Sequence, residues 1–410
     1  MNALPSQNHF TYATDIMTTT ASNQLRANWN FPTTLWFGAE RIKELAQACQ
    51  SLNLHRPLLV TDPALSQLPM VSEAIADNEA QGIVTGLFFD IKPNPNGLNI
   101  ENGVKHYQQH NHDGIIAFGG GSALDAGKAI ALMVGQSRPI WDFEDVGDNW
   151  RRINAEAIVP IIAIPTTAGT GSEVGRASLI IDEARHSKKI IFHPKMLPSI
   201  VIADPQLTTG LPASITAATG MDALSHNLEA YCAPTYHPMA DGIALEGMRL
   251  IKAWLAIACT EPLNIEARSQ MMIASTMGAT AFQKGLGAMH ALAHPLGAIY
   301  DAHHGLLNAI LMPYVLLINR PAIDARMQQL ARYLELDGSD FDSVLDYIIT
   351  LRHHIGIPND LRSIGIDENR IDEIAAEALR DPSAAGNPVP LTQAQYAMLL
   401  RDAINGDLKR

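Results

Sequence analysis

The chain changes character about halfway along its length, and this change constrains the fold more than any other feature. Before Asp204, short apolar runs rich in β-branched residues alternate with segments of helical spacing, which is typical of a parallel sheet covered by helices. After Asp204 the segments are Ala- and Met-rich with helical spacing, and we expect no further strong strand. The sequence therefore predicts an α/β N-terminal domain followed by an all-α C-terminal domain.

A chain of 410 residues exceeds the size at which one hydrophobic core normally stops growing, so two domains are expected. Residues 1–30 are polar and lack the apolar segment and cationic start of a targeting signal, so we expect a tail or arm. The α/β domain would then span 31–210 and the all-helical domain 211–410, with a boundary near Gly210–Pro212.

Local patterns place the individual elements. The expected strands are 56–62, 82–90, 113–120, 157–165 and 199–204. The expected helices are 39–52, 98–110 and 122–134 in the first half, and 214–232, 239–259 and 266–282 at the start of the second.

Composition limits the classes of partner and the compartment. Acidic residues outnumber basic ones by 42 to 29, and the net charge of −13 argues against nucleic acid or an anionic membrane as the main partner. The apolar runs are shorter than the ~20 residues that a membrane helix needs. Cys49, Cys232 and Cys259 lie far apart with no C-x-x-C pair, which favours a reducing cytoplasm. We expect a small-molecule partner.

Three consecutive glycines, Gly119, Gly120 and Gly121, lie between a buried strand and the start of a helix. Glycines let the backbone approach a ligand closely, and a helix N-terminus offers unpaired N–H groups, so this turn is a candidate phosphate site. The G-x-G-x-x-G fingerprint fails at Leu124, and Ala129 stands where a P-loop needs Ser or Thr. A tight βα turn without a ligand is the alternative.

Two further features lie at strand ends. The loop 165–173 is crowded with Thr, Ser and Gly, whose hydroxyl and N–H groups can hydrogen-bond a sugar or phosphate, although such a loop is often only a solvated turn. Asp62 ends a strand, where a carboxylate can accept from ribose hydroxyls and repel a 2′-phosphate, which favours NAD over NADP. An Asp before Pro63 is also a common turn starter.

The helical half contains two pairs of side chains with a spacing of four. Asp222 and His226 form one pair, and His290 and His294 form the other, so each pair lies on one helix face within reach of one metal ion. Pro295 is expected to end or kink the second helix. A hydrogen-bonded histidine cluster is the alternative to a metal site.

Two adjacent histidines, His303 and His304, open the next helical segment. One carboxylate with two or three imidazoles makes a mixed oxygen and nitrogen site for a divalent metal such as iron or zinc. No thiolate lies near in sequence, which excludes a zinc finger.

Four segments carry a family resemblance, and they are "FGGGSALDAGKAIA", "PTTAGTGSEV", "ATGMDALSHNLEAY" and "HALAHPLGAIYDAHHGLLNAILMP". From about Phe31 to near the C-terminus the chain resembles the iron-containing (group III) alcohol dehydrogenases of the dehydroquinate synthase-like superfamily. The resemblance implies a Rossmann-like N-terminal domain that binds NAD and a helical domain that binds Fe(II), with zinc as the other metal. It also implies a homodimer or a higher homo-oligomer.

The resemblance also implies roles for individual residues. The metal ligands would be Asp222, His226, His290 and His304. His294 would lie close to substrate and cofactor without binding metal, and His303 is left as a neighbour. The cofactor-binding residues would be Asp62, Asn94, Gly119, Gly120, Gly121, Ser122, Asp125, Thr166, Thr167, Thr170 and Lys188, with Asn94 near the adenine side and Thr166, Thr167, Thr170 and Lys188 at the nicotinamide half.

The implied reaction interconverts a small alcohol and its aldehyde or ketone in the cleft between the domains. The metal favours loss of the alcohol proton, hydride passes to the nicotinamide, and His294 relays the proton because an imidazole exchanges protons near neutral pH. Gly175 and Ala177 depart from the family pattern beside the expected substrate pocket. The alternatives are a cofactor-assisted lyase or cyclase of the dehydroquinate synthase type, a hydroxyacid dehydrogenase or transhydrogenase, and a non-catalytic protein.

Overall fold

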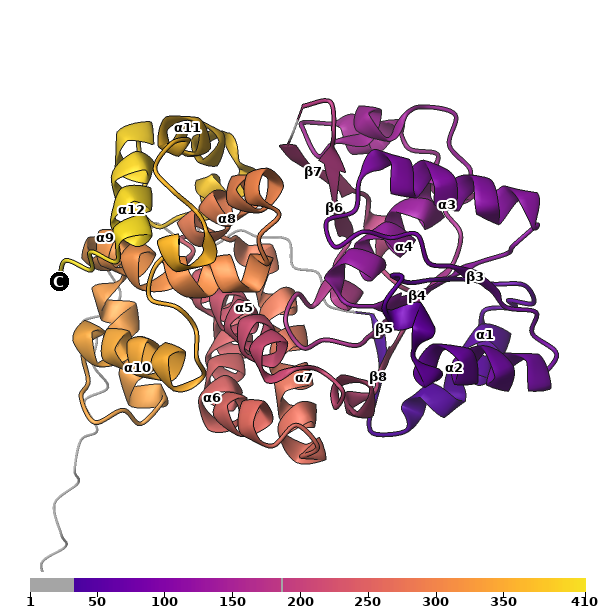
Figure 1. Cartoon of the computed structure of the whole chain (residues 1–410), viewed down its shortest axis with the longest axis horizontal. Helices are drawn as coiled ribbons and strands as arrows, with labels where there is room; N and C mark the ends of the chain where they lie inside the picture. The colour runs from indigo at the N-terminus through magenta and orange to yellow at the C-terminus, as the bar shows by residue number, and fades with distance from the viewer. Residues whose placement is uncertain (1–32, 186) are drawn as a thin grey trace, which may run out of the picture.

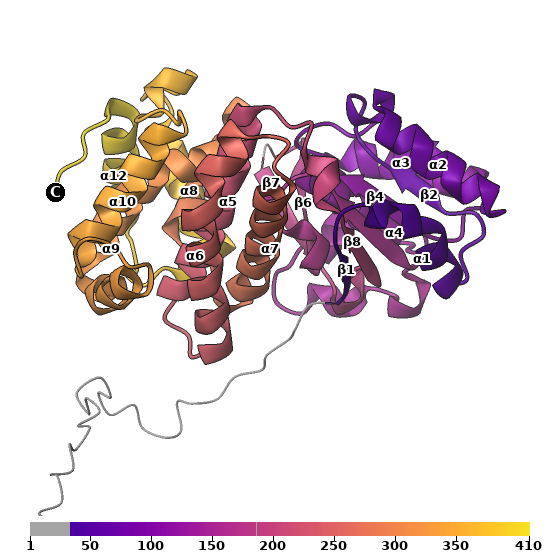
Figure 2. The same cartoon turned by 90° about the horizontal axis from the view of Figure 1, so that it is seen from below.

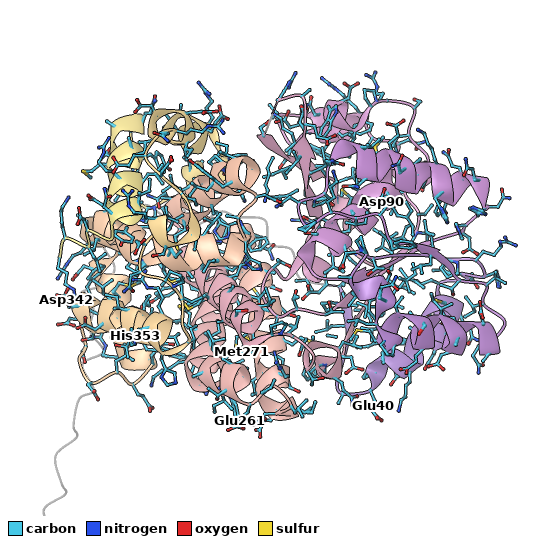
Figure 3. All side chains as sticks on the ribbon, in the orientation of Figure 1. Glu40, Asp90, Glu261, Met271, Asp342 and His353 are labelled. Carbon is cyan, nitrogen blue, oxygen red and sulfur yellow. The ribbon has the colours of Figure 1, made fainter. Side chains whose placement is uncertain are left out.

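The computed structural model describes residues 33–185 and 187–410, and the predicted tail over 1–30 lies outside the described residues. Figure 1 shows a sheet-containing N-terminal domain beside a helical C-terminal domain, as the change in sequence character predicted. Exposed Glu40 and Glu261 lie at the lower edge of the molecule in Figure 3, whereas Met271 of the helical domain is buried.

The N-terminal domain is built on a six-stranded sheet of order β1-β8-β5-β4-β2-β3, and all its strand pairs are parallel. The strands are β1 (Thr34–Phe37), β2 (Leu58–Val60), β3 (Gly86–Phe88), β4 (Ile115–Gly119), β5 (Ile161–Pro165) and β8 (Ile200–Ala203). The five predicted strands are confirmed, although each is shorter than its apolar run. The edge strand β1 was missed because it is short and partly exposed.

Helices cover both faces of this sheet. They are α1 (Leu45–Ser51), α2 (Pro69–Ala80), α3 (Gly97–Gln109) and α4 (Gly121–Met133). Successive strand residues point to opposite faces, so Ile116 packs toward α1 and α2, and Ile115 packs toward α3 and α4. The sequence did not predict α2, and the first half of the predicted helix 39–52 is a 3-10 turn over Arg41–Glu44 before α1.

An antiparallel hairpin, β6 (Ala177–Asp182) and β7 (Ser187–Phe192), stands apart from the main sheet. The sequence analysis assigned no strand here. The alternating burial of β6 shows the period-2 pattern of a strand with one buried face. The hairpin matters for function because β7 contacts α8 of the other domain.

The C-terminal domain is helical throughout its described residues, as predicted. Its helices are α5 (Ala213–Cys232), α6 (Pro238–Thr260), α7 (Ile265–Ala281), α8 (Ala288–Tyr300), α9 (His304–Tyr333), α10 (Phe341–His354), α11 (Ile371–Arg380) and α12 (Gln393–Asn405). Figure 2 shows α7 facing the sheet domain, where it contacts the short turns Ser172–Val174 and Pro205–Thr208.

Two predictions need correction in this domain. The helix carrying His290 was expected to end or kink at Pro295; it does not end there, because α8 continues for another turn to Tyr300. Proline removes one backbone hydrogen bond, and the burial of Leu292 and Leu296 offsets that loss. The helix α9 is long and apolar enough to cross a membrane by length and composition, which the short apolar runs did not suggest. Because 67% of its apolar stretch is buried, it packs as a core helix.

Candidate active site

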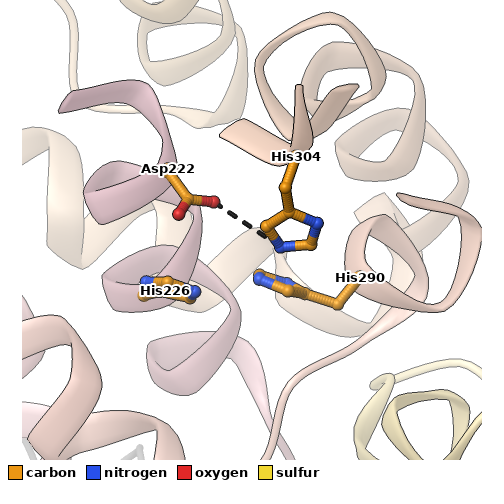
Figure 4. Close-up of side chains that lie close together, drawn as sticks. All are labelled: Asp222, His226, His290 and His304. Carbon is orange, nitrogen blue, oxygen red and sulfur yellow. Dashed lines mark ion pairs between the residues drawn. The ribbon is translucent and has the colours of Figure 1, made fainter. Parts of the chain in front are cut away.

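Four side chains from three helices of the C-terminal domain converge on one point (Figure 4). Asp222 and His226 come from α5, His290 comes from α8, and His304 is the first residue of α9. One ligand atom from each residue lies within 4.8 Å of the others. The structure therefore brings together the four residues that the sequence analysis named as metal ligands.

The imidazoles are oriented by acceptors behind them. The Nδ1 atom of His290 lies 2.7 Å from the Glu229 carboxylate, and that of His226 lies 3.2 Å from the carbonyl oxygen of Gly169. Each Nδ1–H therefore donates outward, which leaves the Nε2 lone pair facing the cluster, as in metal-bound histidines. Glu229 also accepts from the backbone N–H groups of Gly287 and Met289.

Sequence reasoning missed Glu229, although a signal was present. Asp222, His226 and Glu229 follow the i, i+4, i+7 spacing that places them on one face of α5. A carboxylate at that position can hold the histidine of a neighbouring helix.

Asn308 shows that the cluster contains more acceptors than the protein satisfies. Its Nδ2 atom lies 2.9 Å from Asp222 Oδ1, 3.2 Å from His290 Nε2 and 3.1 Å from His304 Nε2. An amide has two hydrogens and cannot serve three acceptors fully. Converging lone pairs on one carboxylate and three imidazoles fit a divalent cation such as iron or zinc.

Burial keeps two of these histidines neutral. It lowers the pKa of His226 to about 4 and holds the pKa of His304 well below its usual value. Burial opposes protonation of His290 as well, but the Glu229 carboxylate outweighs it and raises the His290 pKa. Neutral imidazoles are the form that binds metal.

His294 lies one helical turn after His290 and outside the group of four ligands. Its Nδ1 atom lies 2.8 Å from an oxygen of Asp381, and its ring stacks on that of His304 with centroids 5.4 Å apart. Burial alone would raise the pKa of Asp381, but His294 and the N–H of Ser383 lower it below its usual value. The sequence carried no sign of Asp381, which lies 87 residues away.

The two adjacent histidines have different surroundings. His304 faces the cluster, whereas His303 is exposed and caps α9, where its Nδ1 accepts from the N–H of Leu306 at 3.4 Å. His304 is therefore a candidate ligand, and His303 is a capping residue.

The glycine turn approaches the threonine loop so closely that side chains are excluded. Gly119 has a φ of 147°, which favours glycine, and a Cβ on Gly121 would lie 2.6 Å from the side chain of Thr170. The N–H of Thr166 donates to the carbonyl of Gly119 at 3.0 Å. A Cβ on Gly120 would lie 3.4 Å from the side chain of Thr167, which is an ordinary contact. The two loops therefore form one unit at the start of α4.

Several predicted cofactor residues already have protein partners. Asp125 accepts from Ser172 Oγ and from the N–H of Leu179, so both of its oxygens hold the threonine loop and the hairpin. Asp62 Oδ1 accepts from two N–H groups of the following turn, which is the turn-starter role weighed against ribose binding. Ser122 Oγ donates to the carbonyl of Pro93 at 2.6 Å.

Asn94 and Lys188 lie toward the helical domain. Asn94 Nδ2 donates to Asp301 at 2.5 Å, on the connection between α8 and α9. Lys188 on β7 comes so close to α8 that a Cβ on Gly297 would lie 3.3 Å from its Nζ atom. Burial lowers the pKa of Lys188, and the charges of Asp125, Asp301 and Asp222 oppose this shift.

A cavity of about 330 Å³ lies beside the cluster, between the hairpin and the helical domain. The side chain of Phe282 borders both, since it lines the cavity while its ring meets that of His226 edge-on at 5.1 Å. The lining residues are Asp145, Val174, Gly175, Arg176, Ala177, Ile190, Phe192, Leu197, Ala279, Thr280, Phe282, Gln283, Leu286, Pro382 and Ser383. Gly175 and Ala177, the two departures noted in the sequence, are both among them.

The fold and the site together define a two-domain protein with a candidate metal centre next to a glycine-rich βα turn. Comparison with known families gives this class its name. Residues 32–205 match the model of the iron-containing alcohol dehydrogenases, and residues 216–404 match that of the C-terminal domain of the same family.

Individual relatives agree. The chain is 38% identical over 380 residues to a 4-hydroxybutyrate dehydrogenase of Cupriavidus necator, covering 90% of this chain and 97% of the relative. It superposes on a 1,3-propanediol oxidoreductase with a TM-score of 0.86 at 32% identity, covering 92% and 99% of the two chains. A sulfoacetaldehyde reductase of Bifidobacterium kashiwanohense, solved with NAD⁺, gives 0.84 at 30% identity, covering 93% and 99%.

This chain belongs to the iron-containing alcohol dehydrogenase family. It is an alcohol oxidoreductase, and the family resemblance inferred from the sequence motifs is confirmed.

Proposed function

We propose that the protein oxidises small alcohols, reversibly, with NAD as the hydride acceptor and Fe(II) as the metal. The cluster of Asp222, His226, His290 and His304 carries the proposal, because it offers one oxygen and three nitrogen donors within 4.8 Å. The family name and the NAD⁺ complex of the sulfoacetaldehyde reductase support iron and NAD.

A divalent ion held by these four side chains would supply a fixed positive charge that favours loss of the alcohol proton, and NAD would accept the hydride. His294 is placed to take the proton. Because Asp381 accepts from its Nδ1–H, the Nε2 atom presents a lone pair, so the imidazole acts as a base in one defined tautomer.

The proposed cofactor site joins backbone and side chains. The N–H groups of Gly120, Gly121 and Ser122 open α4 and would bind the pyrophosphate at the positive end of the helix dipole. The threonine loop and Lys188 would flank the nicotinamide half. Asp62 keeps Oδ2 for a ribose hydroxyl, since the turn uses Oδ1.

The cyclase or lyase alternative is less well supported. An acidic, phosphorylated substrate calls for several Arg and Lys side chains. Among the residues that the structure describes, Arg176 is the one Lys or Arg that lines the cavity.

The test is to purify the protein without oxygen, load it with Fe(II), add NAD and a panel of primary alcohols, and follow NADH at 340 nm. We expect turnover that a chelator abolishes and Fe(II) restores. His226→Ala should lose both metal and turnover, while its circular dichroism spectrum stays that of the wild type. Full metal content in this variant would contradict the proposed ligand set.

Two further expectations remain proposals. The three cysteines form no disulfide, which supports a cytoplasmic protein. We propose a homo-oligomer on the strength of the family, and light scattering on a sizing column measures its mass.

A further inference from the structure

The cavity beside the metal cluster contains a cation that the reaction itself does not use. Arg176 precedes β6, lines the cavity, and lies with its guanidinium carbon 5.5 Å from the centre of the Phe192 ring. Stacking on an aromatic ring holds a guanidinium plane in place and leaves its N–H edge free to donate.

Arg176 has no ionic partner within the part of the chain that the structure describes: no carboxylate there lies within 4 Å of it. Two nearby cations are paired. Lys189 on β7 pairs with Glu144 at 2.8 Å, and the buried Lys128 of α4, whose Nζ also donates to the carbonyl of Ala177, pairs with Asp125 at 3.2 Å. A half-buried guanidinium without a counter-ion is a favourable place for an anion.

The other charged residue of the cavity does not neutralise Arg176. Asp145 donates its N–H to the carbonyl of Ile190, so it lies along the edge of β7 that faces away from β6. Arg176 lies at the β6 end of the hairpin, where its carbonyl accepts from the N–H of His193. Asp145 is also exposed, and water screens its charge.

The space between the metal cluster and Arg176 suits a short chain. A Cβ at Gly175 would fit without a clash, since its nearest neighbour would lie at 3.5 Å. Because glycine has no side chain, the cavity is wider at this position. A volume of about 330 Å³ accommodates a small molecule that reaches from Arg176 to the side chain of Phe282, whose ring borders His226 of the cluster. The walls contributed by Val174, Ile190 and Leu286 are apolar.

We propose that Arg176 is a specificity-determining residue and that the preferred substrate is a small alcohol, or its aldehyde, with an anionic group at the far end. Carboxylate and sulfonate share the planar or trigonal oxygen edge that a guanidinium binds through two N–H groups. The reacting carbinol would lie at the metal cluster, and the anion would lie against Arg176. This inference rests on the proposed function and extends it to the substrate class.

The test compares charged and neutral substrates of equal length. Wild-type enzyme loaded with Fe(II) is assayed with 4-hydroxybutanoate against 1,4-butanediol, and with 2-hydroxyethanesulfonate against 1,3-propanediol. We expect the ratio of kcat/KM for the anion over that for the diol to fall about 30-fold in Arg176→Gln, because a charge-assisted contact is lost. Arg176→Lys keeps the charge but not the paired N–H edge, so its ratio should lie between those of the wild type and Arg176→Gln.

Arg185→Gln is the matched control, since Arg185 is on the same hairpin and exposed, paired with Asp182 at 3.7 Å outside the cavity. It should leave both ratios as in the wild type. Added salt should raise the KM of the anions in wild type and have a smaller effect in Arg176→Gln. Comparing the carboxylate and sulfonate pairs tells which anion the cavity prefers.

Unchanged ratios in Arg176→Gln with normal turnover of diols would overturn this inference and leave the proposed function standing. Absence of turnover with every alcohol would instead count against the proposed function. In that case calorimetry with 4-hydroxybutanoate still tests Arg176, since binding to wild type should be at least tenfold tighter than to Arg176→Gln. Equal binding would overturn the inference.

Discussion

The metal cluster and the glycine turn both contact the threonine loop but are built from different parts of the chain. The cluster consists of side chains, each aimed by a partner such as Glu229 behind His290. The turn consists of backbone, and its side chains hold the loops together, as Asp125 does for Ser172. One substitution can abolish a site whose ligands are side chains. A site whose ligands are backbone N–H groups tolerates the loss of a side chain that only flanks it. The predictions below test this contrast, from the largest expected effect to the smallest.

The largest effect is expected at the start of α9, where two adjacent histidines serve as test and control. His304→Ala should remove most of the bound metal and turnover, since His304 Nε2 faces Asp222 at 3.8 Å (Figure 4). His303→Ala should keep its metal and lose only about 1 kcal/mol of stability from the missing cap. The metal content of both variants tests this prediction. Metal loss in His303→Ala but not in His304→Ala would show that the two roles are exchanged.

A smaller effect is expected at His294, which belongs to neither the ligand set nor the backbone site. His294→Ala should retain metal and NAD binding but lose about 10²-fold in turnover at neutral pH, as removal of a general base does. Part of the loss should return at higher pH, where hydroxide can take the proton. Asp381→Asn should show a milder form of the same pH profile, because the carboxylate that holds the proton on Nδ1 of His294 is then lost.

Metal loss in His294→Ala would contradict this role and place the residue among the ligands. A lower melting temperature with an unchanged pH profile would indicate a purely structural residue.

At the backbone site, a side-chain substitution should act weakly. Asp62→Ser should weaken NAD binding about fivefold and improve NADP binding, since one hydrogen-bonded carboxylate oxygen and its repulsion of a 2′-phosphate are lost. Fluorescence titration of both cofactors measures the change. A wild-type preference for NADP would disprove the ribose role of Asp62.

The smallest effect is expected where the two regions meet. Glu173 in the threonine loop is buried and accepts from Thr276 of α7 at 3.3 Å, and burial raises its pKa to about 7. Since this value lies above that of the unfolded chain, the stabilisation is present at low pH and lost as pH rises through about 7.

Glu173→Gln, which stays neutral, should therefore melt about 2–4 °C higher than wild type at pH 8.5 and close to it at pH 5. Calorimetric melting curves at the two pH values test this. An equal shift at both would rule out the carboxyl charge as the cause.

Local spacing in the sequence was enough to place the parallel sheet, the helical half and the pairs Asp222/His226 and His290/His294 on one helix face each. The i, i+4 pairs and the strand alternation are visible in a few consecutive residues, because helices and strands repeat every 3.6 and 2 residues. The family motifs then selected His304 over its neighbour His303, which spacing alone left open.

Only the tertiary structure supplied the partners of those residues. Asp381 reaches His294 across 87 positions and Glu229 reaches His290 across 61, and no local period marks such pairs. The continuation of α8 through Pro295 depends on packing, which overrides the preference of proline. Only the tertiary structure likewise brings Arg176 to the cavity between the hairpin and the helical domain, with no ionic partner among the described residues.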